Sequence, residues 1–315
     1  MSVSTVLFFV LGIVFLWQGA EFLVRGSSRL AMCFGIRPLI VGLTIVAMGT
    51  SSPELAVSLV SAIRETKDIA LGNIIGSNIA NIGLVVSVTA LIHPLDIHIS
   101  TIKREMPFLI ISSFVLLFLS LDHILSFFDG MILFAGFIGF IIYMIKSSAK
   151  QRQEDAAQNG ENTNPRNIKK LTLNALYVVF GLAGLVLGSY WMVQSAVAIA
   201  EAMGVSHMVI AITMVAVGTS LPELAISSVA AFKGEVDIAI GNAVGSNVFN
   251  TLFVIAIVAM VTPIPVKPEL LRFQYVVMLI FTCSALPFMW TQFRLNRKEA
   301  AVLLAGYFTF IYFLF

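Results

Sequence analysis

The chain has 315 residues, of which 58% are hydrophobic and only 11% charged, and its formal net charge is +2. A soluble domain carries about 25% charged residues, so this composition argues against a soluble protein and favours a membrane protein. A net charge this small gives no support for a nucleic-acid partner.

Apolar runs of about 18 or more residues are typical of membrane-spanning helices, and such runs recur along the whole chain. The first run has no Lys or Arg before it, so we expect a retained span rather than a cleaved signal peptide. The sequence therefore predicts an all-α polytopic membrane protein with ten transmembrane helices in a lipid bilayer. The predicted spans are 4–24, 38–62, 69–92, 105–121, 125–146, 171–198, 206–231, 237–261, 271–291 and 299–315.

A polar linker lies between the fifth and sixth predicted spans. Residues 150–170 are rich in Gln, Asn, Glu and Lys, which predicts a mobile loop that acts as a spacer. The chain thus divides into a five-helix repeat at 1–147, a cytoplasmic linker at 148–170 and a second five-helix repeat at 171–315. Because each repeat has an odd number of spans, the second is predicted to be inverted relative to the first. Inverted repeats are typical of secondary transporters.

The distribution of basic residues predicts the orientation in the membrane. If the N-terminus lies outside, all but four of the 19 Lys and Arg residues fall in cytoplasmic loops. The four exceptions are Arg64, Lys67, Lys267 and Arg272. Positive charge favours the cytoplasmic side, so both termini are predicted outside. The compact chain suggests the plasma or inner membrane of a prokaryotic cell.

One polar stretch within the apolar spans occurs twice. Residues 47–58 (AMGTSSPELAVS) match residues 216–227 (AVGTSLPELAIS) at 9 of 12 positions, 169 residues later. At the same offset, residues 68–81 match residues 237–250 at 9 of 14 positions. A constant offset over both segments indicates one duplicated unit rather than two unrelated motifs.

Glu54 and Glu223 are the sharpest signals in this unit, because each lies near the middle of an apolar span. A carboxylate at that depth costs about 2.5–3.5 kcal/mol on insertion scales. The matched segments offer no Lys or Arg within these spans to offset the cost, so a bound cation or a proton is favoured. The alternative is a protonated Glu that forms a hydrogen bond between helices.

Other oxygen-bearing residues accompany each Glu at helical spacing. Thr50 and Ser51 precede Glu54 by about one turn, and Pro53 is expected to bend the helix and free a backbone carbonyl. Oxygen ligands with two carboxylates suit Ca²⁺, while hydroxyls and carbonyls could hold Na⁺. The next span adds the hydroxyl of Ser77 and the amide of Asn81, and the second copy supplies the equivalent groups at Thr219, Ser220, Ser246 and Asn250. Interhelical hydrogen bonding and a role in the site are both open for Asn73, Asn78, Asn242 and Asn247.

With this motif, the sequence resembles the sodium/calcium exchangers of the cation/calcium antiporter superfamily, in their prokaryotic form. The two copies look like the alpha repeats of that family, with Gly-Thr-Ser-x-Pro-Glu followed by Gly-Ser-Asn-x-x-Asn. The resemblance implies a ten-helix bundle in which spans two, three, seven and eight form the site. The ligands that it implies are Ala47 (backbone carbonyl), Thr50, Ser51, Glu54, Ser77 and Asn81, with Ala216, Thr219, Ser220, Glu223, Ser246 and Asn250.

The function implied by the resemblance is secondary active antiport. Na⁺ and Ca²⁺ would share a midmembrane site built on Glu54 and Glu223 and exchange by alternating access. This chain departs from the family pattern at one position. Well-studied sodium/calcium exchangers are similar in this segment but have Asp at the position of Asn250. That difference keeps an alternative open, a Ca²⁺/H⁺ or other cation/H⁺ antiporter in which the same two Glu carry protons.

Two functions of other classes are disfavoured. A passive channel would more naturally arrange rings of ligands around a pore axis. An intramembrane enzyme would need a nucleophile and base, or a metal-binding His/Cys set, and the sequence offers neither. We therefore expect no enzyme activity and no cofactor besides the transported ions, and the sequence indicates no obligate protein partner.

Overall fold

The computed structural model describes residues 3–63, 67–99, 101–159, 168–203 and 218–314. Within these ranges the chain is almost entirely helical, and six helices are long and apolar enough to cross a membrane. A seventh span is formed if the bent pair Pro38–Thr50 and Ser52–Ile63 is counted as one. The prediction of an all-α membrane protein is thus confirmed.

In the first half of the chain, bends and wide π-helical turns divide the apolar runs into several helices. Pro53 accounts for one break, because its ring clashes with the carbonyl four residues earlier. The elements are α1 (Val3–Phe34), α2 (Pro38–Val41), η1 (Gly42–Val46), α3 (Ala47–Thr50), α4 (Ser52–Ile63), α5 (Lys67–Ala80), η2 (Asn81–Val86), α6 (Ser87–Ile92), β1 (Leu95–Asp96), η3 (Thr101–Glu105), α7 (Met106–Leu119), β2 (Ile124–Leu125) and α8 (Phe127–Asn159).

Over its described residues, the second half follows the order of the corresponding elements in the first half. A π-helical turn begins at Asn250 as one does at Asn81, and these two residues are equivalent in the duplicated unit. The elements are α9 (Ile168–Ala202), α11 (Leu221–Phe232), α12 (Val236–Phe249), η4 (Asn250–Val254), α13 (Ile255–Val261), β3 (Ile264–Pro265), η5 (Leu270–Tyr275), α14 (Val276–Trp290), η6 (Thr291–Phe293), β4 (Arg294–Leu295) and α15 (Arg297–Leu314).

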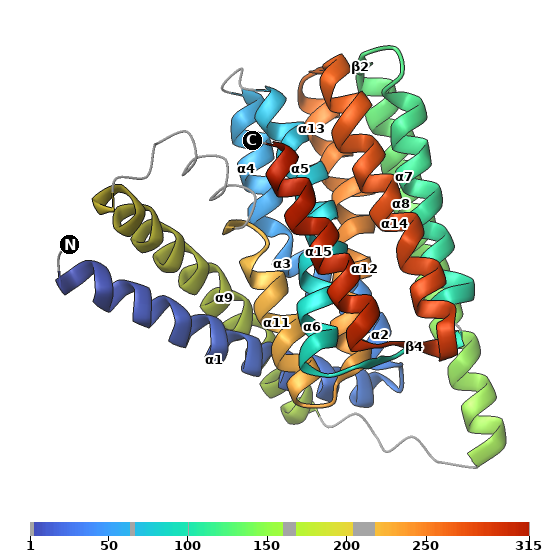
Figure 1. Ribbon diagram of the computed structural model, residues 1–315. Helices are drawn as coiled ribbons and strands as arrows, with labels where there is room; N and C mark the ends of the chain where they lie inside the picture. The colour runs from blue at the N-terminus through green and yellow to red at the C-terminus, as the bar shows by residue number, and fades with distance from the viewer. Residues whose placement is uncertain (1–2, 64–66, 100, 160–167, 204–217, 315) are drawn as a thin grey trace.

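Helices α1 and α9 form a pair that is set apart from the other helices. Figure 1 shows them side by side, running in opposite directions and inclined to the bundle of the remaining helices. Glycines allow their backbones to approach closely, since a Cβ added at Gly19 would lie 2.8 Å from the Gly181 carbonyl oxygen. Gly12 and Gly188 face each other in the same way. The pair therefore packs through small residues, as membrane helices commonly do.

The core of the bundle is built on α5 and α12, the most buried of the candidate spans. The 18-residue windows at Ala70–Ile92 and Val236–Val261 are 78% buried, compared with 28% for the α1 and α9 windows. Helices buried on all sides by protein can carry polar groups that lipid would not tolerate. Many of the polar residues of the duplicated unit accordingly lie on these two central, most buried spans.

Two short antiparallel ladders join the halves of the chain. Strand β1 pairs with β4, with Leu95 opposite Leu295, and β2 pairs with β3, with Leu125 opposite Ile264. Helix α7 separates β1 from β2 along the chain, and Figure 1 shows β2 and β4 at opposite ends of the bundle. Since β1 is equivalent to β3 at the offset of 169 residues, equivalent strands lie at opposite ends of the bundle.

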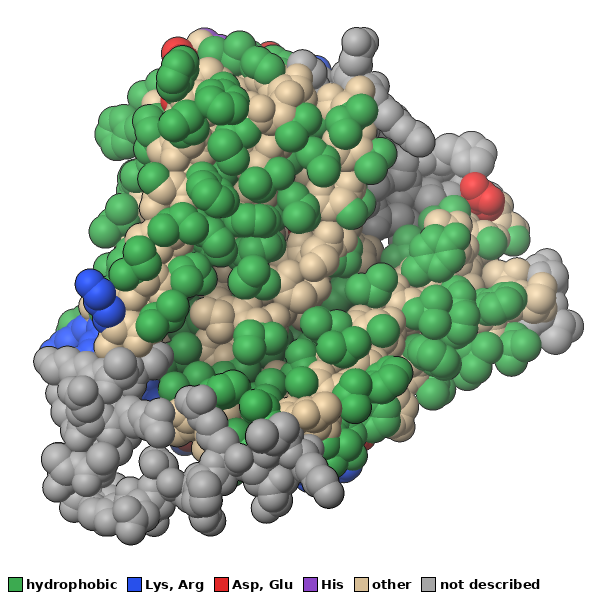
Figure 2. Space-filling model, turned by 180° about the vertical axis from the view of Figure 1, so that it is seen from behind, with side chains coloured by type: hydrophobic (Ala, Val, Ile, Leu, Met, Phe, Trp, Pro, Cys, Tyr) green, Lys and Arg blue, Asp and Glu red, His purple; other side chains and the backbone are tan. Residues whose placement is uncertain are grey.

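The outer surface has the character expected of a protein surrounded by lipid. Hydrophobic side chains cover most of the face in Figure 2, and the few charged side chains visible there lie toward its edges. Exposed residues along α1 and α9 include Trp17, Val179 and Phe180. Such a large apolar surface is typical of a protein that contacts a bilayer or a partner, not water.

Two of the predicted boundaries were wrong. Helix α1 continues to Phe34, ten residues past the predicted end of the first span. Helix α8 continues to Asn159, so the first ten residues of the predicted loop at 150–170 are helical. Lys, Gln, Glu and Ala in that segment are good helix formers, and their polarity argued only against a span. Residues 160–167 of the predicted loop lie outside the described residues, and its last three residues, 168–170, belong to helix α9.

The α1–α9 contact leads to a stability prediction. Gly19→Ala places a methyl group 2.7 Å from the Leu185 backbone nitrogen, so the two helix backbones must shift apart to accommodate it. Overpacking of this kind costs about 1–3 kcal/mol, so the melting temperature of the detergent-solubilised protein should fall by several degrees. Gly139→Ala on α8 is the matched control, because its Cβ would meet nothing within 4 Å. Equal melting temperatures for the two variants would contradict the close packing.

Candidate functional site

The second predicted span is broken beside its carboxylate. Helix α3 ends at Thr50, Ser51 forms the turn, and α4 continues from Ser52 with a bend of 41°. Glu54 consequently lies in the first turn of a new helix. The N-terminus of a helix favours negative charge, so the bend itself provides part of the stabilisation that the buried carboxylate needs.

The second repeat has the same local structure. Helix α11 begins at Leu221 with Pro222 next, and Glu223 lies in its first turn. The residue at the break has nearly the same backbone angles in both copies, with φ −84° and ψ 6° at Ser51 and φ −87° and ψ 3° at Ser220. The duplicated sequence thus places each Glu in the first turn of a helix that begins after the same backbone turn.

Glu54 is 1% exposed and its carboxylate is reached by residues from other helices. The Ser77 hydroxyl, on α5, donates to Glu54 Oε1 over 3.4 Å. Thr219, from the second repeat, lies beside the carboxylate, and its hydroxyl is 3.3 Å from the Ser77 hydroxyl. Glu223 is near enough to interact electrostatically with Glu54. The two predicted carboxylates therefore belong to one site.

Glu223 has a corresponding environment and is fully buried. The Ser51 hydroxyl, from the first repeat, donates to Glu223 Oε1 over 3.1 Å. Thr50 also reaches this carboxylate, and its hydroxyl donates to Asn242 Oδ1 over 3.0 Å. Ser246 lies beside Glu223, but its hydroxyl makes no hydrogen bond of regular geometry. Each carboxylate is thus approached by hydroxyl groups of the opposite repeat.

The last residue of each matched segment, Asn81 or Asn250, is oriented by hydrogen bonds between the repeats. Asn81 donates through Nδ2 to Asn247 Oδ1 over 2.9 Å, and Asn250 donates through Nδ2 to Asn78 Oδ1 over 3.2 Å. The side-chain oxygens of Asn81 and Asn250 are buried and have no hydrogen-bond partner among the described residues. Because the amide nitrogens are engaged, the oxygens are the ends left available to a cation.

Buried oxygens without a donor are the most informative feature of the site. Such atoms are rare in folded proteins, and each needs an explanation such as an ion. Among the described residues, Lys, Arg and His form no ion pair with either Glu. All the unpartnered oxygens in this region belong to ligands implied by the family resemblance, namely Glu54 Oε2, Glu223 Oε2, Asn81 Oδ1, Asn250 Oδ1, Ser220 Oγ and Ser246 Oγ.

The remaining predicted ligands differ in their surroundings. The Ala47 carbonyl accepts a hydrogen bond from Ser51 N at 3.0 Å, and the Thr50 hydroxyl lies 3.3 Å from it. The Thr50 hydroxyl has one proton and a nearer acceptor in Asn242 Oδ1 at 3.0 Å, so the second lone pair of the Ala47 carbonyl is left for a cation. Ala216 lies outside the described residues.

Some polar residues hold the ligands in place. Asn242 donates to the Ser227 hydroxyl over 3.0 Å, and Asn73 donates to the equivalent Ser58 over 3.2 Å. These two hydrogen bonds lie within each repeat and pack its helices together. The side-chain oxygens of the same asparagines accept hydrogen bonds from the site threonines, Asn242 from Thr50 and Asn73 from Thr219. Thr251, which accepts from Asn78 over 2.9 Å, was not predicted. Its equivalent is Ile82, so the duplication gave no signal for it.

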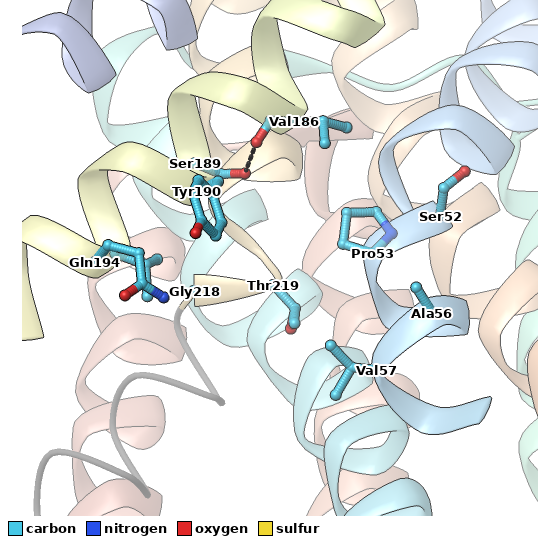
Figure 3. Close-up of a pocket in the computed structure, with 11 residues that line it drawn as sticks. Ser52, Pro53, Ala56, Val57, Val186, Ser189, Tyr190, Gln194, Gly218 and Thr219 are labelled. Atoms are coloured by element: carbon cyan, nitrogen blue, oxygen red, sulfur yellow. Dashed lines mark hydrogen bonds between the residues drawn. The ribbon is translucent and has the colours of Figure 1, made fainter. Parts of the chain in front are cut away.

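The α1–α9 pair contacts the two halves of the bundle differently. On one side α1 packs tightly against α11, where Ala20, Val24 and Ile226 are at most 1% exposed. An ion pair also joins α1 to the end of α11, with Lys233 Nζ 2.8 Å from Glu21 Oε1. On the equivalent side, a pocket of about 580 Å³ separates α9 from α4. Figure 3 shows Thr219 between the two helices that border this pocket.

Comparison with known proteins gives a consistent result. The model of the family described as "Sodium/calcium exchanger protein" matches residues 4–146 and 173–315. The chain is 32% identical to the inner membrane protein YrbG of Escherichia coli over 299 residues, 94% of this chain and 92% of YrbG. It is 30% identical to the sodium/calcium exchanger MaX1 of Methanosarcina acetivorans over 342 residues, 98% of each chain.

A solved structure is similar over the same length. The sodium-calcium exchanger NCX_Mj, soaked with 2.5 mM Na⁺ and 0.1 mM Ca²⁺, matches with a TM-score of 0.86 and 28% identity. The match covers 99% of this chain and 98% of NCX_Mj. These findings identify a multi-pass membrane transporter rather than an enzyme, and the chain belongs to the sodium/calcium exchanger family.

Proposed function

We propose that this chain exchanges Na⁺ for Ca²⁺ across the cell membrane, and that both ions use one midmembrane site on Glu54 and Glu223. The observation that carries the proposal is the pair of buried carboxylates, each with one oxygen lacking any partner and neither paired with a basic residue of the described chain. A carboxylate in such surroundings is costly unless a cation accompanies it.

The chemistry of the surrounding groups suits the two ions. Two carboxylates balance the charge of one Ca²⁺, and the side-chain oxygens of Asn81 and Asn250 are hard ligands for it. For Na⁺ we propose the hydroxyl groups and the carbonyls of Ala47 and Ala216. The proposed hydroxyl ligands are Thr50, Ser51, Ser77, Thr219, Ser220 and Ser246.

We further propose ten transmembrane helices in two inverted repeats, 1–147 and 171–315, joined by a cytoplasmic linker at 148–170. The family model supports this division, since it matches 4–146 and 173–315 separately. The two ladders support the inversion, because equivalent strands lie at opposite ends of the bundle. With both termini outside, all but four of the basic residues remain cytoplasmic, and the similarity to an inner membrane protein supports the cell membrane as the location.

The unequal contacts of the two repeats support our proposal that the exchange proceeds by alternating access. Helices α1 and α11 are in close contact, whereas at the equivalent positions a pocket separates α9 from α4. A transporter built of inverted repeats would alternate between this state and one in which the α9–α4 contact is closed and the α1–α11 contact is open. Coupling follows from electrostatics, since a site that holds two unneutralised carboxylates is too costly to reorient without an ion.

The first prediction concerns the driving ion. Sealed proteoliposomes loaded with Na⁺ should take up external Ca²⁺, and vesicles with only a pH gradient should not. The reason is that hydroxyls and carbonyls beside the carboxylates can replace the hydration shell of Na⁺, which a proton does not need. Uptake driven by the pH gradient alone would establish the alternative, cation/H⁺ exchange on the same two Glu.

The second prediction concerns the carboxylates. Glu54→Gln and Glu223→Gln should each lower Na⁺-dependent Ca²⁺ uptake by about tenfold or more, since each removes a full negative charge from the ion. Glu269→Gln, at an exposed position outside the site, is the control and should transport normally. Uptake retained in Glu54→Gln would remove Glu54 from the site.

The third prediction separates the ligands of the two ions. Thr50→Val and Thr219→Val delete a hydroxyl with little change of shape, so the Na⁺ concentration that gives half-maximal exchange should rise several-fold. The Ca²⁺ concentration that gives half-maximal uptake should change less, because the carboxylates remain. Thr282→Val is the matched control, a buried threonine on α14 outside the site. Equal changes for both ions would contradict the assignment of the hydroxyls to Na⁺.

A further inference from the structure

Asn78 and Asn247 orient the two amide ligands of the site, but they are themselves fixed in different ways. The side-chain oxygen of Asn247 accepts from Asn81, and its amide nitrogen donates to the backbone carbonyl of Asn78 over 3.0 Å. The side-chain oxygen of Asn78 accepts from Asn250, and its amide nitrogen donates to the Thr251 hydroxyl over 2.9 Å. One asparagine is thus held by a backbone carbonyl and the other by a hydroxyl group.

This difference decides how firmly each amide is oriented. A backbone carbonyl can only accept a hydrogen bond, so the nitrogen of Asn247 must face it and its oxygen must face Asn81. A hydroxyl can accept or donate, so the amide of Asn78 could be satisfied by Thr251 in either orientation. The first repeat has no hydroxyl at the equivalent place, because Ile82 corresponds to Thr251.

The Thr251 hydroxyl is the acceptor that allows the Asn78 oxygen to face Asn250. The only other acceptor near the Asn78 amide nitrogen among the described residues is the Met278 sulfur, at 3.8 Å, and a thioether sulfur is a weak acceptor. Asn78, Asn250 and Thr251 are all buried, so water cannot replace a lost partner. A buried N–H without an acceptor is rarer in proteins than a carbonyl oxygen without a donor.

We propose that Thr251 is a positioning residue of the ion site, which keeps the Asn78 oxygen toward Asn250 and thereby the Asn250 oxygen toward bound Ca²⁺. The inference rests on the proposed function, in which that oxygen is a Ca²⁺ ligand. The π-helical turn η4 begins at Asn250, and these two adjacent residues both reach the same asparagine. Without the hydroxyl, the Asn78 amide turns its nitrogen toward Asn250, whose own nitrogen then faces the cation.

The test is a double-mutant cycle on the full-length protein purified in detergent. Ca²⁺ binding in Na⁺-free buffer is measured by isothermal titration calorimetry for the wild type, Thr251→Val, Asn250→Asp and the double variant. In the wild-type background, Thr251→Val should weaken Ca²⁺ binding by about three- to tenfold, because an oxygen ligand is replaced by an amide nitrogen. In the Asn250→Asp background it should weaken binding by less than about twofold, since both ends of a carboxylate are oxygens.

Three further variants separate the hydroxyl from the packing. Thr251→Ser keeps the hydroxyl and should bind Ca²⁺ as the wild type does. Thr251→Ala lacks the hydroxyl and is smaller, so it gives the same comparison if valine does not fit the buried site. Thr282→Val, a buried threonine on α14 outside the site, is the matched control and should leave Ca²⁺ binding unchanged.

The outcomes distinguish this inference from the proposed function. Equal losses of affinity in the two backgrounds would mean that Thr251 supports only the packing, and unchanged binding in Thr251→Val and Thr251→Ala would mean that it orients nothing. Either result overturns the inference and leaves sodium/calcium exchange standing. Absence of Ca²⁺ binding by the wild type would refute the proposed function, and the inference with it.

Discussion

Two carboxylates buried in the centre of an apolar bundle set the constraint on which the rest of the structure depends. With no basic partner in the described chain, Glu54 and Glu223 rely on groups that carry partial charge. Each Glu lies in the first turn of a helix, and hydroxyls supply hydrogen bonds, from Ser51 of the opposite repeat to Glu223 and from Ser77 of the same repeat to Glu54. These groups reduce the cost of the charge without removing it, and this leaves the site attractive to a cation.

The site exists only where the two repeats meet. The Ser51 hydroxyl donates to the carboxylate of Glu223, Thr219 lies beside that of Glu54 and contacts Ser77 and Asn73, and Asn81 donates to Asn247 across the same boundary. Isolated halves would expose these polar groups to lipid, where unpaired groups cost several kcal/mol. Polar hydrogen bonding between the repeats therefore positions the ligands and also holds the halves together at membrane depth.

The sequence predicted the class of fold and the chemistry of the site because the duplication marks both. Glu54 and Glu223 could be found as carboxylates in apolar runs, and the family motif added the hydroxyl and amide residues around them. Thr251 could not be found this way, because its equivalent is Ile82 and the contact it makes is with the other repeat. Composition also misled at 150–159, where polarity was taken for a loop although the residues favour a helix.

The difference between the two sides of the α1–α9 pair could not be predicted from repeated residues alone, yet the sequence contains a reason for it. At the positions of α9 that line the pocket, Val186 and Tyr190 correspond to Trp17 and Glu21 of α1. Trp17 packs edge-on against Phe232, and Glu21 pairs with Lys233, so α1 has contacts to α11 that α9 lacks the side chains to make with α4. An ion pair that is partly exposed contributes about 0.2–1 kcal/mol, and the aromatic contact adds a comparable amount. Divergence at these few positions therefore favours the arrangement in which α1 is packed and α9 is open, even though the ligands beneath them remain nearly symmetric.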